Sequence, residues 1–153
     1  MRYTLLYLVS IVLINIGFIY VPLIHGWPPM SLAVGLVFVL RDFAQREIGH
    51  KVLLVMLVGA VLSYFMASPA VAIASCAAYL VSELVDWAVY TFSKRPLDQR
   101  VLLSSALGTP IDSAVFLGLI GFFSVGGVLL MTASKMLAAF AVFFWLRKGT
   151  NHV

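Results

Sequence analysis

The stretch VAIASCAAYLVSELVDWAVYTF (residues 71–92) is apolar except for a few side chains, of which Glu83 and Asp86 are acidic. Two further stretches, LLSSALGTPIDSAVFLGLIGFF (102–123) and GGVLLMTASKMLAAFAVFFWL (126–146), contain Asp112 and Lys135 in the same way. Each stretch can cross a bilayer as a helix, which takes about 20 mostly apolar residues. A charge at that depth costs roughly 2.5–3.5 kcal/mol or more unless it faces a partner or water. The four side chains therefore indicate a polar site near the middle of the membrane.

Composition places the rest of the chain in the membrane as well. Of the 153 residues, 63% are hydrophobic and 10% are charged, whereas soluble domains are about half apolar and a quarter charged. The length allows about six spans with short loops and no soluble domain. We therefore expect an all-α membrane protein with a single domain, residues 1–153. The net charge of +4 does not indicate nucleic-acid binding, because no basic polar surface is present to carry it.

The residues present argue against several kinds of site and several classes of protein. Cys76 is the single cysteine, so no disulfide can form within the chain. No cysteine and histidine cluster has metal-ligand spacing, and we expect neither a metal nor a cofactor. No histidine lies in a predicted span and no Walker A motif occurs, so we expect neither an intramembrane enzyme nor an ATPase. The apolar N-terminus lacks a cleavage site of small residues, which predicts a retained first helix.

Proline and glycine divide the chain into predicted spans, because proline lacks a backbone donor and glycine tolerates tight turns. The six spans are about 3–24, 30–48, 51–67, 70–93, 101–123 and 127–147. Gly108 and Thr109-Pro110 are expected to interrupt the fifth span, and SKRPLDQR (93–100) is expected to be a polar loop.

Basic residues are distributed unevenly between the predicted connections. HGWPP (25–29), ASPA (67–70) and SVGG (124–127) contain no lysine or arginine. Nine of the ten basic residues fall at the other ends of the spans: Arg2, Arg41, Arg46, Lys51, Lys94, Arg95, Arg100, Arg147 and Lys148. The positive-inside rule makes that side cytoplasmic, which predicts six transmembrane helices with both termini inside.

The depths of the buried charges agree with one another. Glu83 lies eleven residues before Lys94, or about 16 Å along a helix. Asp112 lies twelve residues after Arg100, and Lys135 lies twelve before Arg147, each about 18 Å. Half of the hydrocarbon core is about 15 Å. We therefore expect Glu83, Asp112 and Lys135 to line one cavity, with Asp86 one turn nearer the cytoplasm.

Helical spacing groups further polar and aromatic side chains with these charges. Tyr79, Glu83, Asp86 and Tyr90 recur at spacings of 4, 3 and 4, so they share one helix face. Asp42 and Arg46 are spaced as an i,i+4 pair. The predicted substrate-contacting residues are Asn15, Asp42, Arg46, Glu83, Asp86, Tyr90, Asp112, Phe116 and Lys135.

Simpler roles remain open for several of these residues. Asp112 and Lys135 can form an ion pair that only fixes helix register, and RDFAQRE (41–47) can be the solvated end of a span. The aromatic side chains can be packing or interface anchors. One lysine cannot neutralise three carboxylates, however. We expect some carboxyl groups to be protonated, paired with Arg41 or Arg46, or exposed to a hydrated cavity.

The order of the motifs resembles that of the queuosine precursor transporter family, also called the VUT family. The motifs are Asn15 in the first helix, Asp42-x3-Arg46-x2-Gly49, AYLVSELVDWAVYTF (78–92), SSALGTPIDSAVF (104–116) and Lys135 early in the last helix. The resemblance covers about residues 10–146. It implies a fold like the substrate-binding components of energy-coupling-factor vitamin transporters. It also implies uptake of 7-cyano-7-deazaguanine or 7-aminomethyl-7-deazaguanine across the bacterial cytoplasmic membrane.

The substrate chemistry fits the buried residues. A deazaguanine presents an N–H and an amino group side by side, and a carboxylate can accept from both. Glu83, Asp86 and Asp112 are candidates for that role, while Lys135 can donate to the ring carbonyl. Phe116, Trp87 or Tyr90 can offer a flat surface to the ring.

A second class of function is a binding component that needs an external energising module. Such components usually show an Ala-x3-Ala face on the first helix, which LYLVSIVLINIG (6–17) lacks. The expected partners are therefore the deazapurine and the lipid bilayer, without nucleic acid. Proton coupling through Asp86, facilitated diffusion and the oligomeric state, with a homodimer as one arrangement, stay open.

Overall fold

The computed structural model describes residues 1–22, 29–67 and 71–150, which form a bundle of helices with no strand in these ranges. The HGWPP and ASPA connections lie largely outside the described residues. The helices are α1 (Arg2–Tyr20), α2 (Met30–Ile48), α3 (Val52–Met66), α4 (Ala72–Phe92), α5 (Leu97–Leu119) and α6 (Val125–Thr150), with a short 3-10 helix, η1 (Gly49–Lys51), between α2 and α3.

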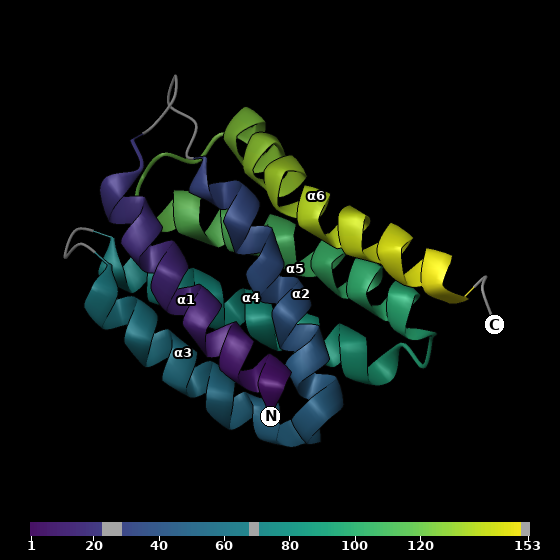
Figure 1. The fold of residues 1–153 in the computed structure, drawn as a ribbon. Helices are drawn as coiled ribbons and strands as arrows, with labels where there is room; N and C mark the ends of the chain where they lie inside the picture. Colours follow the sequence, from purple (N-terminus) through teal and green to yellow (C-terminus); the bar gives the residue numbers. More distant parts are fainter. Residues whose placement is uncertain (23–28, 68–70, 151–153) are drawn as a thin grey trace.

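Five helical stretches of the described chain are long and apolar enough to cross a membrane, which makes this a multi-pass membrane protein. The count differs from the six predicted spans because α2, η1 and α3 follow one another as a single helical stretch, Met30–Met66. α3 alone has 15 residues, or about 22 Å, which is shorter than a hydrocarbon core of about 30 Å. The chain nevertheless changes direction between α2 and α3, at Gly49 with φ of 61° (Figure 1).

α2 lies at the centre of the bundle and contacts every other α-helix. α1 and α3 pack on one side of it, and α5 and α6 pack on the other (Figure 1). An apolar cluster that includes Tyr7, Val37 and Met56 joins α1, α2 and α3. A second one that includes Val39 and Val101 joins α2 to α5 and α6. Polar side chains thus lie between two apolar regions that hold the helices together.

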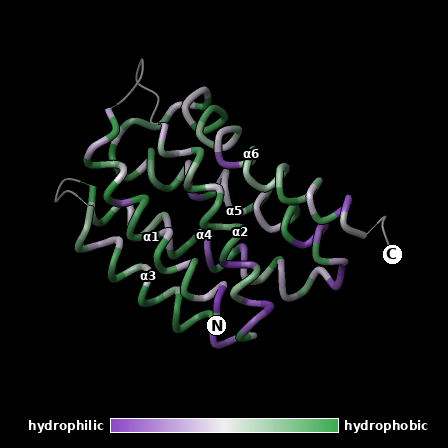
Figure 2. Tube along the Cα trace, viewed as in Figure 1, coloured by the Kyte–Doolittle hydropathy of each residue, from purple (hydrophilic) through white to green (hydrophobic). Residues whose placement is uncertain are grey.

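The bundle is apolar on the outside, as a lipid solvent requires. Large side chains such as Leu5, Phe65 and Ile73 are exposed on its surface. Figure 2 shows hydrophobic residues over most of the outer helix surfaces and hydrophilic ones gathered toward the end where both chain termini lie. α1 and α6 run in opposite directions, so the N-terminus and the C-terminus are at the same end of the bundle (Figure 1).

The first correction concerns the fifth predicted span. The helix α5 is not interrupted at Gly108 or Thr109-Pro110 but continues through Pro110. The Thr109 hydroxyl donates to the Ser105 carbonyl at 2.8 Å, which keeps this turn bonded next to the donor that proline lacks. α5 also begins at Leu97, directly after Pro96, so half of the predicted polar loop is helical.

The second correction concerns α6, which begins at Val125 within the predicted SVGG turn. The Ser124 hydroxyl accepts a hydrogen bond from the Gly127 amide at 3.0 Å. A serine in this position caps the free amides of a first helical turn. The reversal is instead made at Gly121, whose φ is 77°, a value that glycine adopts without strain.

The third correction concerns Arg41, which was counted among the basic residues of the cytoplasmic side. Arg41 and Arg46 lie in the last turns of α2, which ends at Ile48 as expected, but Arg41 is completely buried. Arg46 is exposed. Arg41 therefore cannot contribute to the charge of a cytoplasmic loop, and its environment is described next.

Candidate functional site

Three of the predicted site carboxyl groups surround the buried guanidinium of Arg41. Arg41 Nη1 lies 2.6 Å from Asp42 Oδ1. Its Nε lies 3.2 Å from Glu83 Oε2, and its Nη2 lies 2.9 Å from Asp86 Oδ2. All four side chains are 0–1% exposed. We call Arg41, Asp42, Gln45, Glu83, Asp86 and Ser104 the Arg41 cluster.

Neutral side chains complete the Arg41 cluster. Arg41 Nη1 also donates to Gln45 Oε1 at 2.8 Å, and Gln45 Nε2 donates to the Thr91 hydroxyl at 2.8 Å. The Ser104 hydroxyl donates to Asp42 Oδ2 at 2.7 Å. Asp42 thus has a hydrogen-bond partner on each oxygen, which fixes its side chain next to Arg41.

α1 contacts the Arg41 cluster through Tyr7. The Tyr7 hydroxyl donates to Glu83 Oε2 at 3.2 Å and also contacts the Tyr79 hydroxyl. Tyr7 is fully buried, and sequence reasoning did not include it. A tyrosine in an apolar helix is indistinguishable from a packing residue until its partner is known.

A second polar cluster joins α4, α5 and α6. Lys135 Nζ lies 2.5 Å from Asp112 Oδ2 and donates to the Ser113 hydroxyl at 2.9 Å. The Ser82 hydroxyl donates to Asp112 Oδ1 at 3.2 Å. Lys135 is 1% exposed and Asp112 is 15% exposed. We call Ser82, Asp112, Ser113 and Lys135 the Lys135 cluster.

The predicted single cavity around Glu83, Asp112 and Lys135 is therefore divided between these two clusters. Glu83 pairs with Arg41, whereas Lys135 pairs with Asp112. The two clusters meet at α4, where Ser82 and Glu83 are consecutive residues. The interpretation of Asp112 and Lys135 as an ion pair agrees with the observed geometry.

The local sequences explain how the helices come close enough for these contacts. On α4, Glu83, Asp86 and Tyr90 are buried on one face, as their spacing predicted. On α5, the facing residues are small, and a Cβ on Gly108 would lie 3.4 Å from Asp86 Cβ. Small residues at an interface let helix backbones approach closely in a membrane.

The remaining predicted residues are placed differently. Asn15 donates to the Ile11 carbonyl of its own helix at 2.9 Å and is half-buried. Arg46 is exposed and Asp42 pairs with Arg41, so the predicted Asp42–Arg46 pair is replaced by a closer one. Tyr90 is buried, with the Arg100 guanidinium 5.4 Å from the centre of its ring. Phe116 is half-buried on α5.

Sequence reasoning missed the central role of Arg41, although depth could have revealed it. Arg41 lies eight residues before Gly49, and Asp86 lies eight residues before Lys94. Each is about 12 Å from the end of its helix. Equal depths on neighbouring helices indicate a pair, and an arginine next to Asp42 in an apolar helix needs one.

Three buried carboxyl oxygens of the cluster accept no hydrogen bond from the described residues, and one of them, Asp86 Oδ2, is the oxygen 2.9 Å from Arg41 Nη2. Glu83 Oε1 and Asp86 Oδ1 are buried, and no donor in the described part of the chain hydrogen-bonds to either atom. The indole Nε1 of Trp87, next to Asp86 in sequence, is also buried without an acceptor in the described ranges. Buried polar atoms are nearly always bonded in native proteins, so free ones inside a membrane bundle indicate a place where a ligand can bond.

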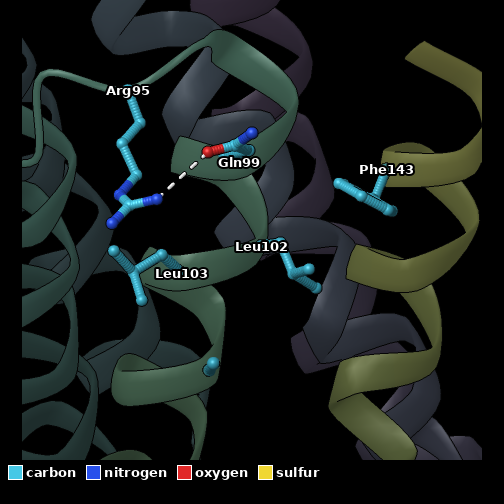
Figure 3. Close-up of a pocket in the computed structure, with 6 residues that line it drawn as sticks. Arg95, Gln99, Leu102, Leu103 and Phe143 are labelled. Atoms are coloured by element: carbon cyan, nitrogen blue, oxygen red, sulfur yellow. Dashed lines mark hydrogen bonds between the residues drawn. The ribbon is translucent and has the colours of Figure 1, made fainter. Parts of the chain in front are cut away.

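The pocket in Figure 3 lies apart from both clusters. It has a volume of about 590 Å³ and is lined by Arg95, Gln99, Leu102, Leu103, Ala106 and Phe143. Arg95 donates to Gln99 Oε1 at 3.3 Å across its rim (Figure 3). Its lining side chains are mainly apolar, and none of them is a buried carboxyl group of the kind that a polar substrate requires.

The described residues show no candidate metal site. Residues 1–22, 29–67 and 71–150 contain no group of three histidine, cysteine, aspartate or glutamate side chains able to hold a metal ion. The carboxyl groups of the Arg41 cluster lie around a guanidinium instead of converging on one point.

Comparison with known proteins identifies one family. Residues 4–148 match the family described as "Putative vitamin uptake transporter". No curated protein and no solved structure matches the chain.

Proposed function

We propose that this chain, which belongs to the vitamin uptake transporter family, imports the queuosine precursors 7-cyano-7-deazaguanine and 7-aminomethyl-7-deazaguanine. The membrane is the bacterial cytoplasmic membrane. The protein acts as a transporter and performs no chemistry on its substrate. The named substrates follow from the resemblance of the motifs around Glu83, Asp86 and Asp112.

The observation that carries this proposal is the pair of free acceptor atoms on buried carboxyl groups. Glu83 Oε1 and Asp86 Oδ1 lie on consecutive turns of one α4 face. The guanine-like edge of a deazapurine carries an N–H and an amino group side by side, and carboxylate oxygens accept such donors strongly. The free indole Nε1 of Trp87 supplies a donor for a ring carbonyl or nitrile.

Arg41 positions these carboxyl groups and does not itself need to touch the substrate. Each of its three nitrogens is already within 3.2 Å of a carboxyl oxygen. A planar guanidinium holds its partners in fixed directions, so the free oxygens of Glu83 and Asp86 have defined positions. The buried Tyr90 ring is on the same α4 face and can provide an aromatic contact.

The proposal includes a topology with six passes and both termini in the cytoplasm. In this topology α3 crosses as a short helix after the turn at Gly49. Support comes from the basic residues outside the bundle core, which include Lys94, Arg95, Arg147 and Lys148. Further support comes from the termini, which lie at one end of the bundle (Figure 1).

Transport then requires that helices separate. Glu83 and Asp86 are 1% and 0% exposed, so a substrate reaches them only when α4 moves relative to α2 or α5. Movement of one group of helices against another around a fixed site is a common way to alternate access. The described arrangement is a closed state of such a cycle.

Uptake by purified protein tests the proposal. The protein is reconstituted in liposomes that contain no other protein, and entry of each labelled precursor is measured. We expect uptake by the unmodified chain and loss of uptake in Glu83→Gln, because an amide group places an N–H donor where the carboxyl group has an oxygen. Asp98→Asn is the matched control, since Asp98 lies outside both clusters.

A cellular measurement complements the liposomes. Cells that lack precursor synthesis and their own transporter receive the gene, and queuosine in tRNA is measured. Queuosine formation in cells without uptake in liposomes would show that an energising module is needed. Absence of both would refute the proposed substrates.

A further inference from the structure

Charge within the Arg41 cluster does not balance. Three carboxyl groups, on Asp42, Glu83 and Asp86, face one guanidinium, so full ionisation would leave two uncompensated negative charges. All of these side chains are 0–1% exposed. An uncompensated charge in an apolar interior is so costly that a buried group takes up a proton instead.

Charges on the surrounding helices do not cancel this excess. The lysine nearest to the cluster in the bundle interior, Lys135, is already paired with Asp112. Arg100 lies over the Tyr90 ring, 5.4 Å from its centre. Other titratable groups on the elements around the cluster include Tyr7 on α1, Tyr79 on α4, the exposed Tyr64 on α3 and, on η1, His50 with its ring 5.8 Å from that of Trp87. Arg46 is exposed, and Glu47 pairs with the N-terminal amine.

The two missing protons can be assigned to particular carboxyl groups. Asp42 has a hydrogen-bond partner on each oxygen, so it is the ionised member of the three. Glu83 and Asp86 each have one oxygen within 3.2 Å of Arg41, and their other oxygens, Oε1 and Oδ1, have no donor among the described residues. One proton on each of these two carboxyl groups makes the cluster neutral, and a protonated carboxyl group keeps lone pairs that can accept from the N–H groups of a ligand.

We propose that Glu83 and Asp86 are both protonated in the substrate-free protein, and that a cationic substrate displaces one of these protons whereas a neutral substrate does not. This inference rests on the proposed function and distinguishes its two substrates. 7-Aminomethyl-7-deazaguanine carries an ammonium group, and 7-cyano-7-deazaguanine is neutral. Binding of the aminomethyl form therefore replaces a proton of the cluster with the ammonium group of the substrate.

The exchange is balanced in atoms and charge. The O–H bond of one carboxylic acid breaks, the proton passes to bulk water, and the carboxylate that remains pairs with the ammonium group. The buried cluster gains one positive charge and loses another, so its net charge stays the same. A neutral substrate that caused the same release would leave a buried negative charge, which is the costly state.

Binding measurements at several pH values test the inference on the full-length protein in detergent or nanodiscs. Dissociation constants for both precursors are measured between about pH 6 and 8, where a primary ammonium group stays protonated. Affinity for the aminomethyl form is expected to fall about tenfold for each unit that the pH decreases, which is the linkage of one proton. Affinity for the cyano form is expected to be unchanged.

Calorimetry in buffers with different ionisation enthalpies gives the proton count directly. We expect release of about one proton for each aminomethyl ligand bound and none for each cyano ligand. Asp98→Asn should keep both values, since Asp98 is outside the cluster.

The outcomes separate this inference from the function on which it rests. Binding of neither precursor refutes the proposed function. Binding of both with the same pH dependence, or of the cyano form alone, leaves the function intact and overturns the proton exchange.

Discussion

Gly35 of α2 packs directly on the backbone of Lys135 in α6. A Cβ at Gly35 would lie 2.0 Å from the Lys135 carbonyl oxygen and 3.0 Å from the Ala138 Cβ. A backbone atom cannot turn aside as a flexible side chain can, so these helices stay close only while residue 35 is glycine.

Gly35→Ala is expected to destabilise the protein by about 1–3 kcal/mol, because overpacking forces the backbones apart. Thermal unfolding in detergent measures the change. Gly118→Ala on α5 is the matched control, because nothing lies within 4 Å of a Cβ there. The control should be neutral or stabilising by about 0.5–1 kcal/mol, as for an added helical alanine. Equal melting temperatures for both variants would contradict the close contact.

Arg41→Met is expected to destabilise the fold by about 3–5 kcal/mol, because it leaves buried carboxyl groups without their cation. Arg46→Met, on the exposed side of the same helix, should change stability by no more than about 0.5 kcal/mol. Unfolding of both variants is compared at one pH. A small effect at Arg41 would show that the cluster is hydrated and not sealed.

The pair Lys135 and Asp112 can be tested by a double-mutant cycle. Lys135→Met and Asp112→Asn should each destabilise the bundle, and the double variant should lose less than the sum of the two. The expected interaction energy is about 0.5–3 kcal/mol, the range for residues in contact. Strict additivity in thermal unfolding would mean that the 2.5 Å contact contributes no energy.

Reporter fusions examine the proposed six passes. A reporter before Arg2 and a reporter after Lys148 should both report the cytoplasm. Reporters on opposite sides would mean that α2 and α3 do not cross separately, as the single stretch Met30–Met66 allows. That result would leave the two charge clusters in place but change which side they open to.

Hydrophobic length and helical spacing predicted the helical architecture and the face that α4 turns inward. Glu83, Asp86 and Tyr90 are buried together, as their spacing of 3 and 4 requires. Helix ends were predicted less well, since Pro110 was taken as a break and lies inside α5. Its effect depends on whether neighbouring side chains bond the adjacent turn, as Thr109 does.

Which helices meet at a given depth could not be predicted from spacing alone. Equal depth made Glu83, Asp112 and Lys135 look like one group, but Glu83 faces α2 and Asp112 faces α6. The choice of partner depends on packing of small residues such as Gly35 and Gly108. The roles of the predicted site residues in substrate binding stay predictions.

Consecutive residues of α4 connect the two clusters, since Ser82 bonds to Asp112 while Glu83 bonds to Arg41. Neighbouring residues on a helix point about 100° apart, so α4 holds α2 with one residue and α5 with the next. A rotation of α4 about its own axis cannot loosen one contact without straining the other. Any rotation of α4 is therefore expected to change the geometry of the Lys135 cluster and of the Arg41 cluster together.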